Sequence, residues 1–167
     1  LADILNRARV RLEEPFILIL DGIQDPHNLG ALLRSAEGAG VHGVIIPKHR
    51  AASLTAAVGR ASAGAMEYMA VARVTNLTRA IKELQKQGLW VAGADPQGEK
   101  PYNDADLTGP IALVVGSEGK GIRRLVKENC DFLLSLPMRG RISSLNASVA
   151  GSLLMYEVVR QRAASNG

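Results

Sequence analysis

The sequence predicts an α/β fold with a mostly parallel sheet flanked by helices. Short apolar runs alternate along the chain with segments whose apolar residues recur at helical spacing. Runs such as residues 16–20 and 111–115 show no polar alternation, which is typical of strands buried on both faces of a parallel sheet. The chain has 167 residues, enough for one domain with a substantial core.

The individual elements follow from the same patterns, taken in chain order. A first helix is expected over residues 1–12, where Glu13, Glu14 and Pro15 end it. Strands are expected at residues 16–20, 43–46, 68–71, 89–94, 111–115 and 132–136. One helix is expected to begin with Asn28 as its N-cap. Further helices are expected at residues 53–60, 76–87, 122–127 and 146–162. Residues 95–109 are expected to form a loop, and Trp90 is expected in the core.

The helix after the first strand has an informative distribution of side chains. Its expected buried stripe consists of Leu29, Leu32, Leu33, Ala36 and Gly40. Roughly opposite the stripe lies Arg34, with Gly30 and Gly38 one turn to either side of it. A glycine inside a helix costs about 1 kcal/mol relative to alanine. Two interpretations fit: another group approaches this face closely, or Arg34 is a surface residue on a weak helix.

The last helix is apolar on most of its circumference. Val149, Leu153 and Tyr156 lie on one side, and Leu154 and Val158 belong to the remaining apolar surface. A helix of this kind must be buried on more than one face. We therefore expect a homodimer in which Leu154 and Val158 contact the second subunit.

Composition narrows the possible functions. A net charge of +4 and an isoelectric point near 9.5 favour nucleic-acid binding, whereas 4% aromatic residues argue against a protein that stacks single-stranded bases. Cys130 is the only cysteine, which excludes an internal disulfide and a cysteine-based zinc cluster. The chain shows neither an apolar run of about 18 residues nor a signal-peptide pattern, and we expect a cytoplasmic protein.

Three polar, glycine-containing loops are the candidate ligand sites. They cover residues 21–34, 116–124 and 137–146, and each follows a predicted strand, where α/β proteins bind ligands. The third opens directly into a helix, which either presents free backbone N–H groups to a ligand or is an ordinary capped turn. The loop Gly116-Ser-Glu-Gly-Lys-Gly121 matches neither a Walker A loop nor the dinucleotide fingerprint. Motifs for a metal site or an acyl nucleophile are absent from the sequence.

The stretches DPHNLGALLRSAEGAG, LVVGSEGKGIRR and LPMRGRISSLNASVA are similar to the three motifs of the SpoU (TrmH-like) ribose 2′-O-methyltransferases of the SPOUT superfamily. The resemblance runs from about Phe16 to Arg160, with all three motifs in order. The segments HNLGALLRSAEGAGVHGVIIPK and SLNASVAGSLLMYEVVR most resemble the RlmB type, which modifies a guanosine of large-subunit (23S) ribosomal RNA.

The resemblance implies a C-terminal deep trefoil knot, a homodimer, RNA as substrate and S-adenosylmethionine as cofactor, without a metal. The cofactor's adenosine would rest near Gly116, Leu136 and Leu145, with Met138 and Ser144 close by. The family's polar active-site positions match Asn28, Arg34, Glu118, Ser144 and Asn146. Residues 1–14 would be a linker helix from an N-terminal RNA-binding domain, and residues 15–167 the catalytic domain.

Methyl transfer from a sulfonium needs an aligned nucleophile and a site that excludes water. A ribose hydroxyl is a poor nucleophile, so a proton acceptor or a charge stabiliser is required. Because a guanidinium stays protonated, we expect Arg34 to hold a substrate phosphate and stabilise the developing alkoxide rather than act as a base. Asn28 and Asn146 would orient Arg34, and Glu118 would anchor a neighbouring loop or the partner subunit.

Other functions fit parts of this pattern. A transfer-RNA ribose methyltransferase of the same family has the same motifs. A non-catalytic RNA-binding module on the same scaffold is a second alternative, although Arg34, Glu118 and Asn146 argue against it. A nucleotide-binding α/β enzyme unrelated to methylation is a third, and comparing the binding of S-adenosylmethionine, ATP and NAD would distinguish it.

Overall fold

The computed structural model describes residues 1–49 and 51–166. Its elements, in chain order, are α1 (Ala2–Val10), β1 (Phe16–Asp21), α2 (Pro26–Ala39), β2 (Gly43–Pro47), α3 (Ala56–Ala61), the 3-10 helix η1 (Ala65–Glu67), β3 (Val71–Val74), α4 (Leu77–Lys86), β4 (Trp90–Ala94), β5 (Lys100–Pro101), β6 (Ile111–Gly116), α5 (Arg124–Glu128), β7 (Phe132–Ser135) and α6 (Ala147–Asn166).

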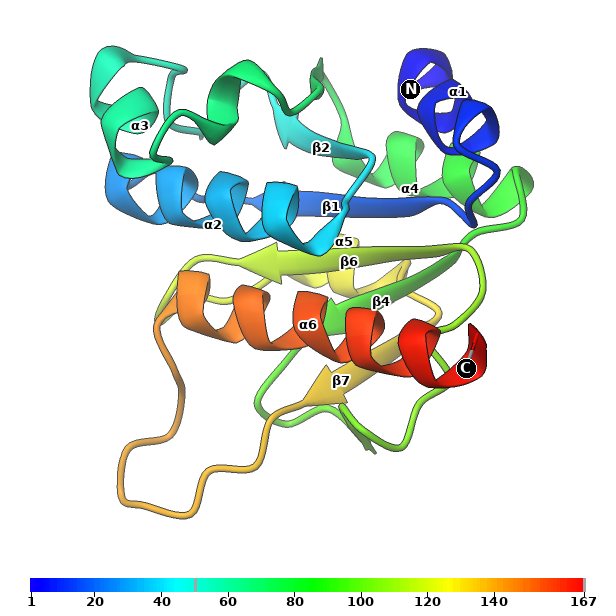
Figure 1. Ribbon diagram of the computed structural model, residues 1–167. Helices are drawn as coiled ribbons and strands as arrows, with labels where there is room; N and C mark the ends of the chain where they lie inside the picture. Colours follow the sequence, from blue (N-terminus) through cyan, green and yellow to red (C-terminus); the bar gives the residue numbers. More distant parts are fainter. Residues whose placement is uncertain (50, 167) are drawn as a thin grey trace.

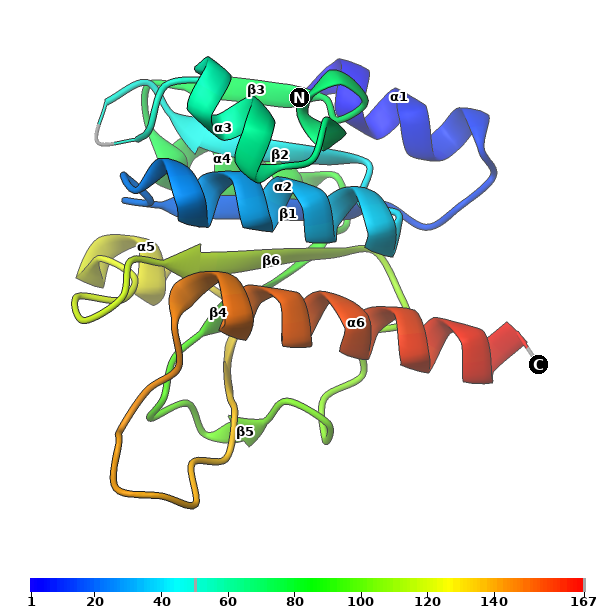
Figure 2. The ribbon, with the colours of Figure 1, turned by 60° about the vertical axis from the view of Figure 1, so that its left-hand side comes forward.

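Within the described residues, seven strands form one sheet in the order β3-β2-β1-β6-β4-β7-β5. Every pairing between these strands is parallel, so the predicted α/β fold with a parallel sheet is confirmed. Helices α2 and α6 lie side by side on one face, and α4 and α5 lie on the other (Figures 1 and 2). The C-terminal knot stays a prediction.

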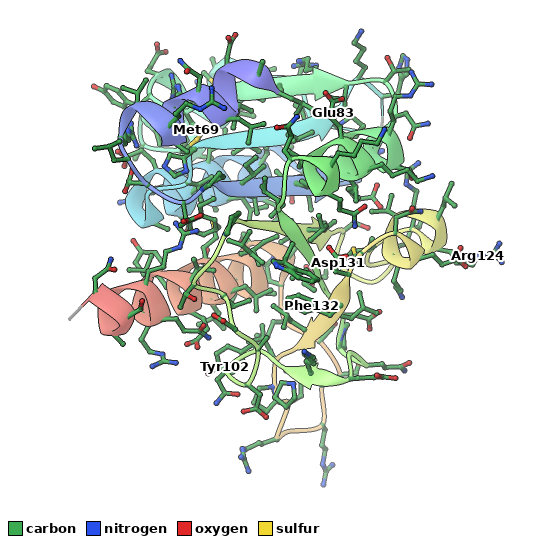
Figure 3. All side chains as sticks on the ribbon, turned by 90° about the vertical axis from the view of Figure 1, so that its right-hand side faces the viewer. Met69, Glu83, Tyr102, Arg124, Asp131 and Phe132 are labelled. Atoms are coloured by element: carbon green, nitrogen blue, oxygen red, sulfur yellow. The ribbon has the colours of Figure 1, made fainter. Side chains whose placement is uncertain are left out.

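The two central strands, β1 and β6, position the candidate site. They pair over their full length, from Phe16 opposite Ile111 to Asp21 opposite Gly116. The carboxyl ends of both strands therefore meet at one edge of the sheet. Strand β5 is the edge of the sheet opposite to β3, and β7 lies beside it; Figure 3 labels Phe132 of β7 and Tyr102, which follows β5, at this end of the molecule.

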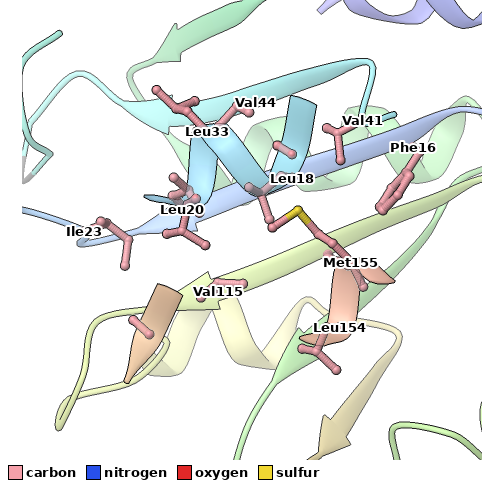
Figure 4. Packing of buried hydrophobic residues seen from close by; sticks show 14 of the residues in the cluster. Phe16, Leu18, Leu20, Ile23, Leu33, Val41, Val44, Val115, Leu154 and Met155 are labelled. Atoms are coloured by element: carbon pink, nitrogen blue, oxygen red, sulfur yellow. The ribbon is translucent and has the colours of Figure 1, made fainter. Parts of the chain in front are cut away.

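The continuous apolar run of β1 is explained by two separate clusters of core residues. Phe16, Leu18 and Leu20 belong to the cluster beneath α2 and α6, and Figure 4 shows Met155 of α6 reaching toward Leu18. Ile17 and Ile19 belong to the cluster on the opposite face, together with residues of α1, α4 and α5. Both faces of the strand are buried, so no polar alternation is possible.

Helix α1 packs on the second of these clusters. Ile4 is buried there, directly against Gly43, where an added Cβ would lie 2.5 Å from the Ile4 side chain. The expected first helix is confirmed, and the linker role of residues 1–14 stays a prediction. Among the helices of residues 1–49 and 51–166, none is long and apolar enough to cross a membrane.

Several local predictions are wrong. The third strand occupies Val71–Val74 instead of residues 68–71, and a short strand, β5, interrupts the expected loop at residues 95–109. Trp90 is 59% exposed because it is the first residue of β4, at the end of the sheet, where the flanking helices do not bury it.

Helix α2 begins and ends differently from the prediction. Its N-cap is Asp25, whose carboxylate accepts a hydrogen bond from the His27 backbone, and Pro26 occupies the first turn, so Asn28 is not the cap. Gly40 does not belong to the buried stripe. It ends the helix in the left-handed conformation, with φ of 78°.

The two glycines beside Arg34 are approached closely, and by the protein itself. An added Cβ at Gly30 would lie 2.4 Å from the Cβ of Ala61, because α3 packs directly on α2. At Gly38 the added Cβ would lie 2.7 Å from the hydroxyl oxygen of Tyr156 on α6. The glycines therefore allow α2 to be packed between α3 and α6.

Helix α6 is buried on one side only. Leu154, Met155 and Val158 lie in the core of this chain, between α2 and the sheet, so the expectation that Leu154 and Val158 contact a second subunit is wrong. The apolar residues left exposed are Val149, Leu153 and Tyr156, each close to half exposed. The periodicity of the helix could not distinguish burial by its own sheet from burial by a partner.

Candidate active site

A cavity of about 350 Å³ opens at the carboxyl ends of β4, β6 and β7. Its walls come from the segments that follow these three strands and from the first turns of α6. The segment between β7 and α6 projects from the body of the protein and supplies one wall (Figures 1 and 2). This position, at the carboxyl edge of a parallel sheet, is where open α/β proteins bind small ligands.

The structure places six of the candidate site residues in the wall of this cavity. They are Gly116, Glu118, Leu136, Met138, Ser144 and Leu145. The segments that carry them are far apart in sequence and come together only at this edge of the sheet. The cavity thus collects every position that the sequence analysis associates with cofactor binding.

Gly116 allows the backbone to fold tightly at the floor of the cavity. A Cβ at this position would lie 2.2 Å from the backbone carbonyl carbon of Gly121. The segment folds back on itself, with the Gly121 backbone N–H donating to the Ser117 carbonyl oxygen at 2.7 Å. Gly119 and Gly121 both have positive φ, of 86° and 66°. Glycines therefore shape this wall of the cavity.

Asn28, Glu118 and Asn146 form a polar cluster that joins the three loops. The Asn146 side-chain amide donates to Asn28 Oδ1 at 3.2 Å and to Glu118 Oε2 at 3.3 Å. Asn146 Oδ1 accepts from the backbone N–H groups of Ser148 and Val149, which caps the start of α6. Because the oxygen is committed to the helix, the orientation of the amide is fixed, and both of its N–H groups point at Asn28 and Glu118.

Arg34 lies apart from this cluster. It is exposed on α2, six residues beyond Asn28, which corresponds to about 9 Å along the helix axis. The cavity wall in the described part of the chain does not include Arg34. The structure therefore brings together Asn28, Glu118 and Asn146, places Ser144 in the cavity wall, and leaves Arg34 outside.

Two acidic residues that the sequence analysis did not assign also lie at this edge. Asp21 is buried at the end of β1 and accepts two hydrogen bonds from Arg123. Asp95 follows β4, lines the cavity and pairs with Lys127 at 2.6 Å. Asp21 ends the buried strand β1, and Asp95 directly follows β4. Their positions at the carboxyl ends of strands are the sequence feature that could have marked them as site residues.

The Asp95 carboxylate is held in its charged form. Burial alone would raise the pKa of Asp95, but hydrogen bonds from Lys127 and the Gln97 backbone, with the Lys127 charge, outweigh it and lower the pKa below its ordinary value. The described residues contain no group of three or more His, Cys, Asp or Glu placed to hold a metal ion. The chemistry available at the site is thus that of amides, carboxylates and backbone groups around a small cavity.

Comparison with known proteins finds relatives that are named as RNA methyltransferases. Residues 15–156 match the SpoU rRNA Methylase family. The TrmH family tRNA/rRNA methyltransferase YacO of Bacillus subtilis (strain 168) is 54% identical over 162 residues, covering 97% of this chain and 65% of the relative. The 23S rRNA (guanosine-2′-O-)-methyltransferase RlmB of Pectobacterium atrosepticum is 52% identical over 151 residues, covering 90% of this chain and 62% of the relative.

A solved structure shares the fold. The SpoU methyltransferase AviRb from Streptomyces viridochromogenes, in complex with the cofactor AdoMet, superimposes with a TM-score of 0.84 at 31% identity, covering 93% of this chain and 64% of that chain. The chain described here spans less than two thirds of the length of each of these relatives. The family match over most of the sequence, with identity above one half to named members, shows that the chain belongs to the SpoU rRNA Methylase family.

Proposed function

We propose that the chain transfers a methyl group from S-adenosylmethionine to the ribose 2′-hydroxyl of a guanosine in 23S ribosomal RNA. The observation that carries the proposal is the cavity itself, with the cluster of Asn28, Glu118 and Asn146 joining two loops of its wall to the loop that carries Asn28. The substrate follows from the name of the RlmB relative, and the cofactor from the AdoMet complex of AviRb.

The residues of the cavity fit this cofactor. Leu136, Met138 and Leu145 supply apolar surface for an adenine ring, and Gly116 lets the segment 117–122 pack closely at the floor of the cavity. Ser144 and Glu118 add polar groups for the amino-acid end of the molecule. When bound, the cofactor supplies an electrophilic methyl group on a sulfonium, which needs no metal.

The polar cluster is suited to orienting the acceptor ribose. Since Asn28 Oδ1 accepts from Asn146, the Asn28 amide N–H groups are turned away from that bond and are available to a substrate oxygen. Glu118 is held by Asn146 through one oxygen, Oε2. Together these groups would fix the direction from which the 2′-hydroxyl approaches, which is the main requirement of a displacement reaction.

Arg34 would act on the charge of the substrate. Its guanidinium, exposed on α2, can hold an RNA phosphate and stabilise the alkoxide that develops as the hydroxyl attacks. Because Arg34 lies outside the cavity wall, the role requires either a substrate that spans the distance or a second copy of the chain beside the site.

The chain also has an open, mostly apolar groove that a second copy would cover. An open groove between α2 and α6 is lined by Ala31, Ser148, Val149, Ser152, Leu153 and Tyr156. We name it the α2/α6 groove and propose that it is the interface of a homodimer. The groove lies between α2, which carries Arg34, and α6, whose start is capped by Asn146, so dimerisation would place the second copy next to the polar cluster. A ribosomal RNA substrate would place the protein in the cytoplasm.

The test is a methylation assay with S-adenosylmethionine carrying a labelled methyl group. Transcripts of 23S ribosomal RNA and of transfer RNA are offered separately, and the nucleosides are then identified by mass spectrometry. We expect 2′-O-methylguanosine in the 23S transcript. Product in transfer RNA alone would support the transfer-RNA alternative, and RNA binding without methylation or cofactor binding would support a non-catalytic module.

A further inference from the structure

Resting on this proposed function, we propose that Asp21 and Arg123 are positioning residues that set the affinity for the cofactor. Neither residue lines the cavity or belongs to the polar cluster. Their contact instead holds the segment 117–122, which we name the Gly116 loop. This loop forms one wall of the cavity and carries Glu118.

The contact is short and largely buried on the acidic side. The Asp21 side chain is 1% exposed. Asp21 Oδ2 accepts a hydrogen bond from the Arg123 backbone N–H at 2.8 Å, and Oδ1 accepts from Arg123 Nε–H at 2.8 Å. Asp21 also lies opposite Gly116 in the pairing of β1 with β6. The Asp21 carboxylate thus fixes Arg123, which directly follows the Gly116 loop, relative to β6, the strand that precedes the loop.

The start of the loop is fixed by a different device. Gly116 has no Cβ, and the carbonyl carbon of Gly121 occupies the space that a Cβ would need. The Gly121 N–H donates to the Ser117 carbonyl, which closes the loop on itself. With Arg123 tied to Asp21, the loop is held at both ends while all six of its residues, among them Lys120, line the cavity.

Loss of the Asp21 contact therefore has a defined consequence. The loop would keep its internal hydrogen bond but lose its attachment to β1, so the wall of the cavity and the Glu118 carboxylate could shift together. The Asp21 carboxylate is deeply buried, and an unpaired carboxylate at that depth is unfavourable, which makes the paired geometry the preferred one. The pair then acts through the loop on ligand binding, without touching the ligand.

The decisive experiment compares two adjacent arginines. In Arg123→Ala, Asp21 keeps the backbone N–H but loses the Nε–H donor. In the control Arg124→Ala, the lost side chain is 90% exposed, pairs with Glu128 one turn away, and points away from the protein (Figure 3). Calorimetry with S-adenosylhomocysteine is expected to show affinity weakened about tenfold in Arg123→Ala, the effect of one charge-assisted hydrogen bond, and wild-type affinity in Arg124→Ala.

Asp21→Asn provides the second variant. Its side-chain amide has the same size but presents N–H donors to Arg123, which offers only donors, so at least one hydrogen bond is lost. We expect an affinity at least as weak as in Arg123→Ala. The double variant is expected to be no weaker than Asp21→Asn alone, because both changes break the same contact.

A kinetic measurement separates positioning from general stability. In the methylation assay with the 23S transcript, Arg123→Ala is expected to raise the KM for S-adenosylmethionine while leaving the KM for RNA unchanged. A merely structural role would lower the fraction of folded protein and reduce kcat without changing either KM. Thermal unfolding of each variant shows whether the fold is retained, and if Asp21→Asn does not fold, Arg123→Ala decides.

The outcomes keep the two proposals distinguishable. A wild-type chain that binds no S-adenosylhomocysteine would overturn the proposed function. A wild-type chain that binds it, with Arg123→Ala and Asp21→Asn binding as tightly as Arg124→Ala, would overturn only the role of the Asp21–Arg123 pair.

Discussion

The side-chain amide of Asn146 donates a hydrogen bond to the side-chain oxygen of Asn28, 118 positions away in the sequence, at 3.2 Å. This contact links the start of α6 to the first turns of α2. Its geometry assigns separate tasks to the two ends of the Asn146 side chain. The oxygen caps α6, and the nitrogen serves the polar cluster.

Asn146→Asp should separate these tasks. An aspartate keeps an oxygen for the cap of α6 but has no N–H for Asn28, and it places a second carboxylate beside Glu118. We expect normal folding and a fall in methyl transfer of roughly tenfold to a hundredfold, the range for one to two lost hydrogen bonds. Asn146→Ala should in addition lower the free energy of unfolding by about 1 kcal/mol, because it removes the cap. Chemical unfolding and the methylation assay measure the two effects; equal activity of Asn146→Asp and wild type would contradict this assignment.

Gly116→Ala tests the tight backbone packing below the cavity. The new methyl group would collide with the backbone of Gly121, so the loop must move or the protein must lose stability, by about 1–3 kcal/mol for an overpacked site. Gly109→Ala is the matched control, since an added Cβ there meets nothing within 4 Å. We expect calorimetry to show loss of cofactor binding in Gly116→Ala only. Unchanged affinity in both variants would mean that the cofactor does not use this wall.

Arg34→Ala should affect catalysis alone. Arg34 is exposed and lies outside the cavity wall, so unfolding and cofactor affinity should match those of the wild type. Methyl transfer should fall at least a hundredfold if the guanidinium stabilises charge in the transition state, and Arg34→Lys should recover little because an ammonium lacks the planar fork. Arg79→Ala, an exposed arginine on α4 across the sheet, is the control. Near-normal turnover of Arg34→Ala would remove this residue from the mechanism.

The sequence predicted the fold because its strongest signals are periodic. The apolar runs of β1 and β6 and the amphipathic pattern of α4, including its Asn76 cap, depend only on local spacing. Trp90 was misplaced because an apolar residue at the end of a strand is buried only if a neighbouring element reaches it. Leu154 and Val158 were assigned to the wrong neighbour for a similar reason, since spacing does not identify the surface that a helix covers.

For the site, the sequence identified loops but not their contacts. Gly116, Leu136 and Leu145 were placed by resemblance to a family, and their meeting in one cavity depends on the strand order β6-β4-β7. That order is not sequential, and the chain pattern does not reveal it. Asp21 and Asp95 were overlooked because a lone acid after a strand is equally typical of a turn, and only the partners Arg123 and Lys127 distinguish the two cases.

The Asp95–Lys127 pair should make stability depend on pH on the acid side. The folded-state pKa of Asp95 lies below its ordinary value, so its contribution to stability is present above about pH 4 and is lost as pH falls through the folded pKa. Asp95→Asn should therefore be less stable than the wild type near neutrality, with the difference shrinking toward pH 3. Urea unfolding at pH 7, 5 and 3 measures this, and the difference should also shrink at neutral pH in a Lys127→Met background. A difference independent of pH would show that the carboxylate charge is not what stabilises this turn.

Two substitutions on α6 test the proposed dimer. Leu153 is 47% exposed in the α2/α6 groove, whereas Val158, five residues further on, is fully buried in the core of its own chain. Leu153→Glu should leave the circular dichroism spectrum and cofactor affinity unchanged and convert dimers to monomers, because a charge would be desolvated at the interface. Val158→Glu should instead unfold the chain, since it places an unpaired carboxylate in the core. Ala164→Glu, in the exposed last turn of α6, is the control and should change neither property. Sedimentation velocity at micromolar concentration decides between the outcomes. A wild-type chain that is monomeric would contradict the proposed homodimer. A Leu153→Glu variant that stays dimeric would show that the interface lies outside the α2/α6 groove.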